Sequence, residues 1–356
     1  MKSRKETNNN LTRRDFLKRT SASAIGVSLL GSYPFNSSAS YKNLISPKSK
    51  VVLIRSSKVI NSEGTVNRLL LKEMLNIAIT QFSGKKNATE FWKTNFSLNE
   101  TIGLKVNTLG LNSISGSPLI DHFNALTTVI LDSFSTSDFK MENFITWDRS
   151  EEELVSAGFT IQKENGKPKV IANVESRRGS GGIGYSEEEF PVGEKSTHIS
   201  KILTEMCSSL INIPVMKDHG TAGFTGALKN HYGSINNARD FHSNNCTNPG
   251  IPEINLIPVI RNKQKLIIAD ALLGVFNGGP RWDRNNMFTY GGILVSTDPV
   301  AIDRIMLNII NERRKIEGLS EISNNFAKHI TIAKELGLGT DNLNEIDFKE
   351  INFDLS

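Results

Sequence analysis

Residues 209–246 read SLINIPVMKDHGTAGFTGALKNHYGSINNARDFHSNNC, and this stretch decides the fold. Its apolar run Leu210–Val215 is too uniform for a half-exposed strand and predicts a buried strand of a parallel sheet. Glycines at positions 220, 223, 226 and 233 follow the run and let the backbone approach a ligand closely. We expect Gly220–Gly226 to lead into a short helix that carries Lys229 and Asn230, with amide donors at its start that suit an anion.

Similar apolar runs recur on both sides of this stretch, at residues 51–55, 102–106, 143–147, 169–174, 266–269 and 292–295. Segments with the 3.6-residue period of a helix lie among them, at residues 66–82, 117–134, 196–206, 300–310 and 324–336. Strands that alternate with helices predict an α/β fold. We expect a mostly parallel sheet with helices on both faces, in one large domain over residues 50–356.

Several of the predicted strands are followed directly by polar residues, and in such a sheet working residues lie at the carboxyl ends of strands. Lys217 comes directly after an apolar strand and before Asp-His-Gly, which is not the setting of a solvated surface lysine. It is predicted to hold a carboxylate or phosphate, or to act as a base or Schiff-base amine if it is desolvated. His219 is its natural acid–base partner.

The predicted site has two groups of residues. The catalytic candidates are Lys217, His219 and Asp270. The candidates for binding substrate are Lys105, Asn107, Asp148, Lys229, Asn230 and Arg281, the last carried by the loop Gly278–Arg281. A lone acid at a strand end is often only a helix cap, and a Gly-Gly-Pro loop is often only a turn.

Three further side chains, His231, His242 and Cys246, are ligand types that suit a divalent transition metal. Their spacing matches no standard metal motif, and the alternative is that the histidines hydrogen-bond loops. The chain has two cysteines, Cys207 and Cys246, too few for an iron–sulfur cluster bound by four cysteines, and we expect none. Whether the two pair as a disulfide is left open.

Three other features have a simpler interpretation. Gly179–Gly184 contains closely spaced glycines but is followed by acidic residues rather than a helix, so we interpret it as a loop or lid and not a dinucleotide site. Asp298 before Pro299 is interpreted as a helix N-cap. Asp303, a turn later, remains a candidate for an acid that supports the site from behind.

The first 39 residues resemble a twin-arginine signal peptide. The segment TRRDFLK at Thr12–Lys18 contains Arg13 and Arg14, and the apolar run Ala24–Gly31 follows it. That run is far shorter than the roughly 20 residues that span a bilayer, so we expect no stable membrane span. We expect residues 40–49 to be a linker, the twin-arginine machinery to be a partner, and the folded protein to be exported to the periplasm or another extracytoplasmic space.

Removing the signal changes the charge of the chain. The whole chain has 42 Lys and Arg against 37 Asp and Glu, but residues 1–39 carry seven of the former and two of the latter. The remainder is formally neutral. Bulk charge therefore gives no reason to expect a nucleic-acid partner.

Several motifs together resemble the domain of unknown function 362 family. They are KDHG followed by ALKNHYG, FHSNNC at 241–246, IIADALLGVFNGGP at 267–280 and VSTDPVAIDRI at 295–305, with LKVN at 104–107 and WDRS at 147–150. The resemblance implies an exported single-domain α/β protein of unassigned activity. Some relatives carry ferredoxin-like cysteines and have been suspected of redox roles; this chain has no CxxCxxC run.

The sequence thus favours an exported enzyme that acts on a small anionic substrate, with metal assistance as one version. The alternative is a periplasmic ligand- or cofactor-binding protein without turnover. The same lysines, histidines and glycine loops would serve either protein, and the reaction and the cofactor stay unassigned.

Overall fold

A mixed sheet of ten strands organises the fold in a computed structural model, which describes residues 48–111, 113–176 and 179–355. The predicted signal peptide and all but the end of the predicted linker lie outside these residues. The strand order is β12-β1-β11-β10-β7-β2-β3-β4, with β8 and β9 attached beside β10. The strands of this sheet are β1 (Ser49–Arg55), β2 (Ile102–Lys105), β3 (Phe144–Ser150), β4 (Lys169–Val174), β7 (Ser209–Asn212), β8 (Val215–His219), β9 (Gly223–Thr225), β10 (Gln264–Val275), β11 (Met287–Ser296) and β12 (Ile346–Asn352).

Most neighbouring strands are parallel. β2 pairs in parallel with β3 and with β7, β3 with β4, and β10 with both β7 and β8, whereas β11 runs antiparallel to β1 and β10. Strands β7 and β8 are one path broken at Ile213 and Pro214, where proline cannot donate to the ladder. The first part of β10 pairs with β7 and the rest with β8, across a register shift between Asp270 and Gly274. After the break, β8 pairs with β10 in a different register from β7, and Lys217 and His219 lie on this second part of the path.

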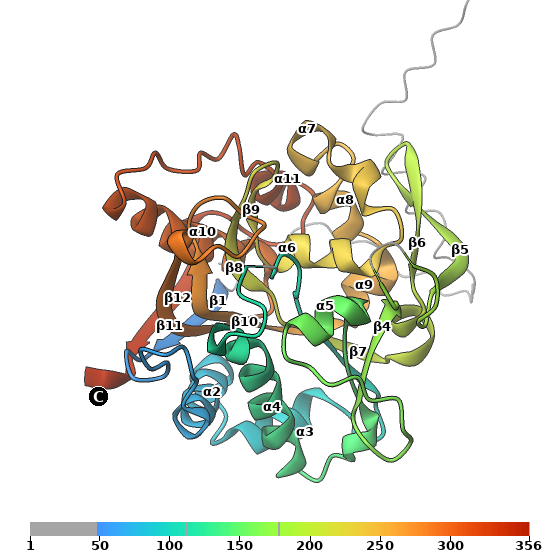
Figure 1. The fold of residues 1–356 in the computed structure, drawn as a ribbon, viewed down its shortest axis with the longest axis horizontal. Helices are drawn as coiled ribbons and strands as arrows, with labels where there is room; N and C mark the ends of the chain where they lie inside the picture. The colour runs from blue at the N-terminus through green and yellow to red at the C-terminus, as the bar shows by residue number, and fades with distance from the viewer. Residues whose placement is uncertain (1–47, 112, 177–178, 356) are drawn as a thin grey trace, which may run out of the picture. The chain divides into compact units, whose positions relative to one another are not determined.

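Helices cover both faces of the sheet (Figure 1). One face is covered by α2 (Arg68–Ser83), α3 (Ala88–Asn95) and α4 (Asp121–Ser135). The other face is covered by α6 (Ala227–Asn230), α8 (Ile251–Asn255), α9 (Pro258–Lys263), α10 (Pro299–Ile316) and α11 (His329–Glu335). The short helix α5 (Glu151–Ser156) follows β3, and the short helix α7 (Ser243–Cys246) follows η5 (Ala238–Phe241). Apolar cores lie on both faces of the sheet, as the near-continuous apolar strands require.

The predicted class, a single α/β domain with a mostly parallel sheet covered on both faces, is confirmed. The Asp298 cap is confirmed as well: its carboxylate accepts from the amides of Val300 and Ala301, with Pro299 at the first helical position. The predicted helix at residues 196–206 is wrong. Its first part is β6 (Lys195–Ser200), which pairs with β5 (Tyr185–Val192) as a hairpin, and only Ile202–Met206 forms a π-helical turn.

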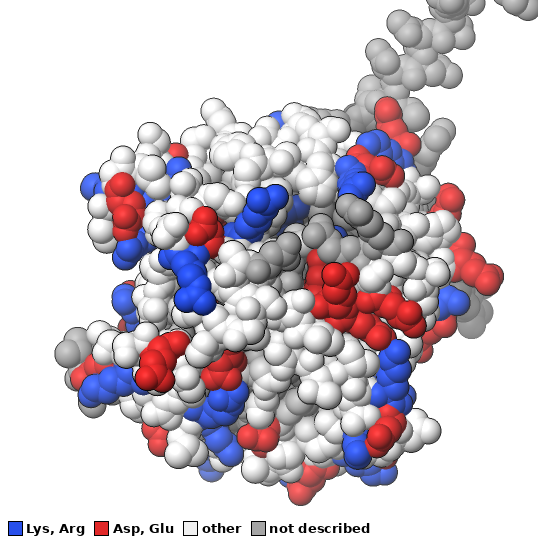
Figure 2. All heavy atoms as spheres, viewed as in Figure 1, with Lys and Arg blue, Asp and Glu red and all other residues white. Residues whose placement is uncertain are grey.

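Charged side chains of both signs are interspersed over the face in Figure 2. Acidic side chains gather on this face over α5, whose first turn carries Glu151, Glu152 and Glu153. Within residues 48–355, as far as they are described, no helix is both long and apolar enough to cross a membrane.

Candidate active site

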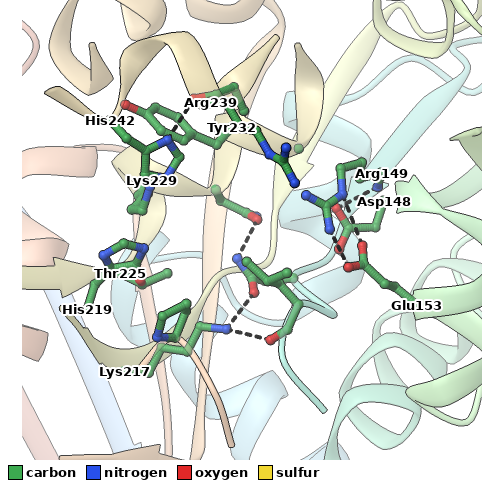
Figure 3. Close-up of a pocket in the computed structure, with 16 residues that line it drawn as sticks. Asp148, Arg149, Glu153, Lys217, His219, Thr225, Lys229, Tyr232, Arg239 and His242 are labelled. Atoms are coloured by element: carbon green, nitrogen blue, oxygen red, sulfur yellow. Dashed lines mark hydrogen bonds and ion pairs between the residues drawn. The ribbon is translucent and has the colours of Figure 1, made fainter. Parts of the chain in front are cut away.

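A cavity of about 310 Å³ opens at the carboxyl ends of β2, β3 and β8 (Figure 3). Its volume lies at the lower end of the range for small-molecule sites. Seven of the predicted site residues line it: Asn107, Asp148, Lys217, His219, Lys229, Asn230 and His242. The parallel register explains why they meet, because β2 lies between β7 and β3 and all three strands end at the same edge.

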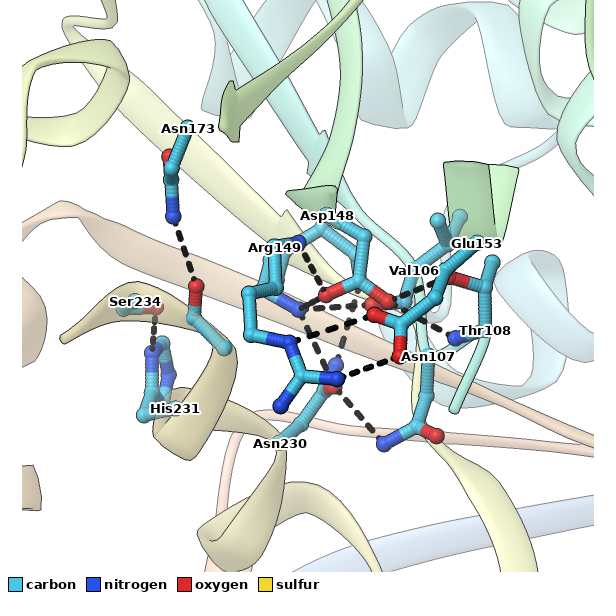
Figure 4. A network of polar contacts seen from close by, with 12 residues as sticks. Val106, Asn107, Thr108, Asp148, Arg149, Glu153, Asn173, Asn230, His231 and Ser234 are labelled. Carbon is cyan, nitrogen blue, oxygen red and sulfur yellow. Dashed lines mark hydrogen bonds and ion pairs between the residues drawn. The ribbon is translucent and has the colours of Figure 1, made fainter. Parts of the chain in front are cut away.

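A continuous chain of hydrogen bonds connects Asp148 to Lys217; Figure 4 shows its part from Asp148 to Asn107, and Figure 3 shows the hydrogen bonds of Lys217. The Lys105 ammonium donates to Asp148 Oδ1 at 2.6 Å and lies 3.3 Å from Asn230 Oδ1. Asn107 Nδ2 donates to the same Asn230 oxygen at 3.1 Å, and Asn107 Oδ1 accepts from Lys217 Nζ at 3.1 Å. The chain connects four elements that are distant in sequence, so it fixes the position of the Lys217 amine.

Asp148 is the anionic end of this chain and is almost completely buried. Its other oxygen accepts from the amide and the hydroxyl of Thr108, each at 2.7 Å. Burial alone would raise the pKa of Asp148, but the Lys105 ammonium and the Thr108 hydrogen bonds outweigh it and hold the pKa below its ordinary value. Gly233 is required here, because a Cβ at this position would lie 2.6 Å from Asp148 Oδ1 and 2.7 Å from Lys105 Nζ.

Lys217 is fully buried against protein yet lines the cavity. Its amine donates to Asn107 Oδ1 and, at 2.9 Å, to the carbonyl of Leu109. Burial lowers the pKa of Lys217 to about 7, and the nearby charge of Lys229 acts in the same direction. A substantial share of this side chain is therefore the neutral amine at neutral pH.

His219 is held as one neutral tautomer. The backbone N–H groups of Thr221 and Ala222 both donate to its Nδ1, at 3.0 and 3.1 Å. Because a backbone amide can only donate, Nδ1 carries no proton and Nε2 carries the ring hydrogen. Burial, together with the charge of Lys229, lowers the pKa of His219 to about 2. His219 is thus a hydrogen-bond donor through Nε2 at neutral pH, and its role in acid–base catalysis stays a prediction.

His242 has the opposite arrangement. Its Nδ1 lies 2.8 Å from the carbonyl oxygen of Ala238, so Nδ1 must be the protonated donor. Burial and then the charge of Lys229 lower the pKa of His242, which leaves Nε2 as an acceptor. The two imidazole rings are 6.1 Å apart between centroids and line the same cavity, where they offer one donor and one acceptor.

Lys229 is buried, with its ammonium 3.6 Å from the centroid of the Tyr232 ring. Contact with an aromatic face favours the charged form. Burial nonetheless lowers the pKa of Lys229 to about 8. Behind it, Cys246 ends a run of left-handed residues that begins at Asn244, an unusual conformation for cysteine. Strained backbone of this kind tends to occur at functional sites.

The sequence analysis missed four polar side chains of the cavity. Arg149 and Glu153 form a two-bond ion pair on the wall opposite Lys217. Arg239 is exposed at the mouth, and in Figure 3 its guanidinium points toward the cavity. Thr225 Oγ1 is buried and has no hydrogen-bond partner among the described residues. Arg149 is part of WDRS and Arg239 lies two residues before FHSNNC, so these motifs are the signal that could have found them.

The amides at the start of α6 do not face a ligand, contrary to the expectation. The carboxylate of Asp303 accepts from the amides of Ala227 and Leu228, at 2.6 and 3.1 Å. Gly226 makes room for it, because a Cβ there would lie 2.2 Å from Asp303 Oδ1. Asp303 therefore supports the site indirectly by binding the start of α6, which is the role suggested for it. Its own carboxylate occupies the place at these amides that was expected for an anionic ligand. Burial raises its pKa to about 7.

Lys105, His231 and Cys246 lie behind the residues that line the cavity, and two further predicted residues, Asp270 and Arg281, lie away from it. Asp270 is buried beside α4, where its Oδ2 lies 2.6 Å from His122 Nδ1 and its Oδ1 accepts from the amide of Leu272. Arg281 is exposed, because the neighbouring Trp282 is inserted into the core and directs Arg281 outward. Pro280 lines the cavity from this loop instead.

The predicted metal ligands do not converge. Both ring nitrogens of His231 are engaged, by Ser234 Oγ at 3.1 Å and by Gln264 Oε1 at 3.0 Å, as the alternative interpretation expected. His242 lines the cavity, while Cys246 is fully buried behind it. In the described part of the chain no three His, Cys, Asp or Glu side chains are arranged to hold a metal ion, so the donor set does not fit a resident transition metal.

The structure also bears on the two cysteines and on the glycine-rich segment at residues 179–184. Cys207 and Cys246 are both buried free thiols and do not pair. The described part of Gly179–Gly184 connects β4 to β5 with no helix after it, so it lacks the strand–glycine–helix order of a dinucleotide site.

Comparison with known proteins gives one family. Residues 165–308 match the family model described as domain of unknown function (DUF362). The match contains Lys217, His219, Lys229, Arg239 and His242 but not the strand ends at 105–107 and 148–153, which complete the cavity.

No curated protein matches the chain. Among solved structures, a Thermotoga maritima protein from a structural genomics programme aligns with a TM-score of 0.35 and 12% sequence identity. The alignment covers 76% of this chain and 60% of that protein, so the chain spans less than two thirds of its length. The family resemblance found in the sequence is confirmed over residues 165–308, where the chain matches the DUF362 model.

Proposed function

We propose that the cavity binds a small organic anion and that the protein is an enzyme acting on it. One observation carries the proposal: Lys217, Lys229 and Arg239 all line the cavity, and among the described residues no carboxylate lies within ion-pair distance of any of them. Lysine and arginine are seldom buried or gathered without partners. An anionic ligand would supply the missing charge.

Two further features support a ligand in this position. Thr225 Oγ1 is a buried hydroxyl without a partner in the described residues, and it lines the same cavity. The Nε2–H of His219 is a fixed donor on the same wall. A carboxylate, phosphoryl or carbonyl oxygen would satisfy both groups.

The arrangement also supports chemistry beyond binding. A neutral amine on Lys217, a donor on His219 and an acceptor on His242 occupy one cavity, and titratable groups with displaced pKa values are typical of active sites. The alternative, a ligand-binding protein without turnover, shares the cationic groups but does not need a lysine with a pKa near neutrality.

Thermal unfolding with added anions tests the proposal. Pyruvate, dihydroxyacetone phosphate and inorganic phosphate would be compared at constant ionic strength. A ligand at 100 times its Kd stabilises by about 2.7 kcal/mol, or roughly 5 °C for a domain of this size. The shift should fall in Lys229→Met and Arg239→Met and persist in Lys72→Met, an exposed lysine on α2. Equal shifts in all four proteins would contradict the proposal. Consumption of a stabilising anion, followed by proton NMR, separates an enzyme from a binding protein.

We further propose that the folded protein is exported by the twin-arginine pathway. The support is the TRRDFLK motif with the short apolar run behind it, and the even charge of the remaining chain. Fractionation of cells that express the full chain tests this. Arg13→Lys with Arg14→Lys should retain the protein in the cytoplasm, whereas Lys2→Gln should not. Export of the double variant at the wild-type level would refute this proposal.

A further inference from the structure

The bonding of the Lys217 amine leaves one direction unused. A neutral amine has two hydrogens and one lone pair. Two acceptors, Asn107 Oδ1 at 3.1 Å and the Leu109 carbonyl at 2.9 Å, take the two hydrogens. Asn107 cannot turn its amide around, because its Nδ2 donates to Asn230 Oδ1. The remaining tetrahedral position of the nitrogen is the lone pair, and Lys217 contributes to the cavity wall.

The surroundings of Lys217 favour a neutral nucleophile. The side chain is 0% exposed, and no carboxylate in the described part of the chain forms an ion pair with it. The indole of Trp282 lies 5.6 Å from the amine on one side. Burial lowers the pKa of Lys217 and outweighs the carboxylates of Asp148 and Glu153, which favour protonation, while the charge of Lys229 opposes it. Desolvation together with a neighbouring cation is one of the known ways to activate a lysine amine.

We propose that Lys217 forms a Schiff base with the carbonyl group of a small anionic aldehyde or ketone. The proposal rests on the anion-binding function above and specifies its substrate class. Lys229 and Arg239 bind the carboxylate or phosphate of the substrate. The Nε2–H of His219 donates to the carbonyl oxygen.

The reaction balances without any added oxidant or reductant. The lone pair of Lys217 Nζ attacks the carbonyl carbon, a C–N bond forms, and the π electrons of the carbonyl move to oxygen. One nitrogen proton passes through Nε2 of His242 to the resulting oxyanion, which gives a neutral carbinolamine with a hydroxyl group. The second nitrogen proton follows the same route to that hydroxyl as the C–O bond breaks, so water leaves and a neutral imine remains. The products are one imine and one water.

Lys229 is not the nucleophile in this account. Its ammonium rests on the face of Tyr232, and the described residues offer it no hydrogen-bond acceptor that would orient a neutral amine. Of the two buried lysines that line the cavity, Lys217 and Lys229, it is Lys217 that has both amine hydrogens directed by fixed acceptors.

Borohydride trapping tests the proposal with the full exported chain. The protein is incubated with pyruvate or dihydroxyacetone phosphate and treated with sodium borohydride, which reduces an imine to a stable secondary amine. Intact and peptide mass spectrometry then count and locate the adduct. We expect one adduct per chain on Lys217, absent from Lys217→Met and Lys217→Arg and unchanged in Lys72→Met. Circular dichroism verifies that each variant is folded.

Asn107→Ala provides a second test that keeps the nucleophile. With one acceptor lost, the amine is no longer oriented, so the trapping rate at a saturating concentration of the carbonyl compound should fall at least tenfold. No adduct with either carbonyl compound, or adducts spread equally over surface lysines, would overturn the Schiff base. If pyruvate or phosphate still stabilises the protein in that case, the anion-binding proposal survives; if neither does, both proposals fall.

Discussion

Asp148→Asn is predicted to destabilise the protein severely, because it leaves the Lys105 ammonium buried without a counter-charge. The Lys105 side chain is 1% exposed, and after the substitution its remaining acceptors are the Val106 carbonyl at 2.7 Å and Asn230 Oδ1 at 3.3 Å. Removing one partner of a buried ion pair costs about 3–5 kcal/mol. For a domain of this size that corresponds to a melting temperature roughly 6–10 °C lower.

The reverse substitution should be milder. In Lys105→Met the Asp148 carboxylate keeps three donors, the amide and hydroxyl of Thr108 and the amide of Arg149. The loss is then that of a charged hydrogen bond, about 1.5–3 kcal/mol. In the double variant the two losses should overlap, with a coupling energy of about 2–3 kcal/mol.

The surface offers a control pair of the same length. Lys93 and Asp138 are also 2.6 Å apart, but their side chains are 43% and 78% exposed. Asp138→Asn should cost less than about 1 kcal/mol, since solvent screens the pair and asparagine tolerates the left-handed backbone of this residue. Urea unfolding at pH 7, followed by the fluorescence of the buried tryptophans, measures all five proteins. Equal losses at Asp148 and Asp138, or a coupling energy near zero, would refute the reasoning.

Three further predictions follow from the site. Gly226→Ala should lower the free energy of unfolding by about 1–3 kcal/mol, because the new Cβ would lie 2.2 Å from Asp303 Oδ1. Gly220→Ala is the control and should be tolerated, because the nearest atom to its Cβ would be 3.6 Å away; a similar cost at both positions would contradict the close packing. Lys217→Met should gain stability relative to the wild type as the pH falls from 10 to 7. In the unfolded wild type Lys217 has its ordinary pKa of 10.5 and takes up a proton in this range, whereas in the folded protein its pKa is about 7 and it stays mostly neutral, so the wild type loses stability. A difference in unfolding free energy that does not change with pH would argue against a buried neutral amine. Titration with Ellman's reagent, without reductant, should find two thiols per chain after denaturation and almost none before, because both cysteines are buried and unpaired; no thiols in the denatured chain would mean that they are paired.

The sequence allowed much of the sheet and the main cavity to be predicted, for a physical reason. Buried parallel strands are near-continuous apolar runs, and their carboxyl ends meet at one edge, so Asn107, Asp148 and Lys217 could be assigned to one site without coordinates. Strand β12 was missed because it lies at the sheet edge with mostly exposed side chains. The β5–β6 hairpin was missed because β5 is rich in glutamate.

The failures within the site also have physical causes. A strand end predicts the edge of the sheet but not which face a side chain points to, and Asp270 turns to His122 beside α4. Histidine type and spacing do not reveal the hydrogen bonds that fix a tautomer, so the sequence could not show that two backbone amides make His219 a donor through Nε2. The amides of α6 looked available for a ligand because Asp303, 76 residues from Ala227, could not be placed against them from the sequence.

The central claim, that Lys229 and Arg239 form an anion site beside Lys217, is tested most directly by anomalous diffraction. Crystals grown without multivalent anions would be soaked in sodium selenate and measured at the selenium edge. The account predicts a selenium peak in the cavity within hydrogen-bond reach of Lys229 or Arg239, lost in crystals of the Lys229→Met variant. Selenate bound only at the outer surface, with the cavity unoccupied at saturating concentration, would contradict it.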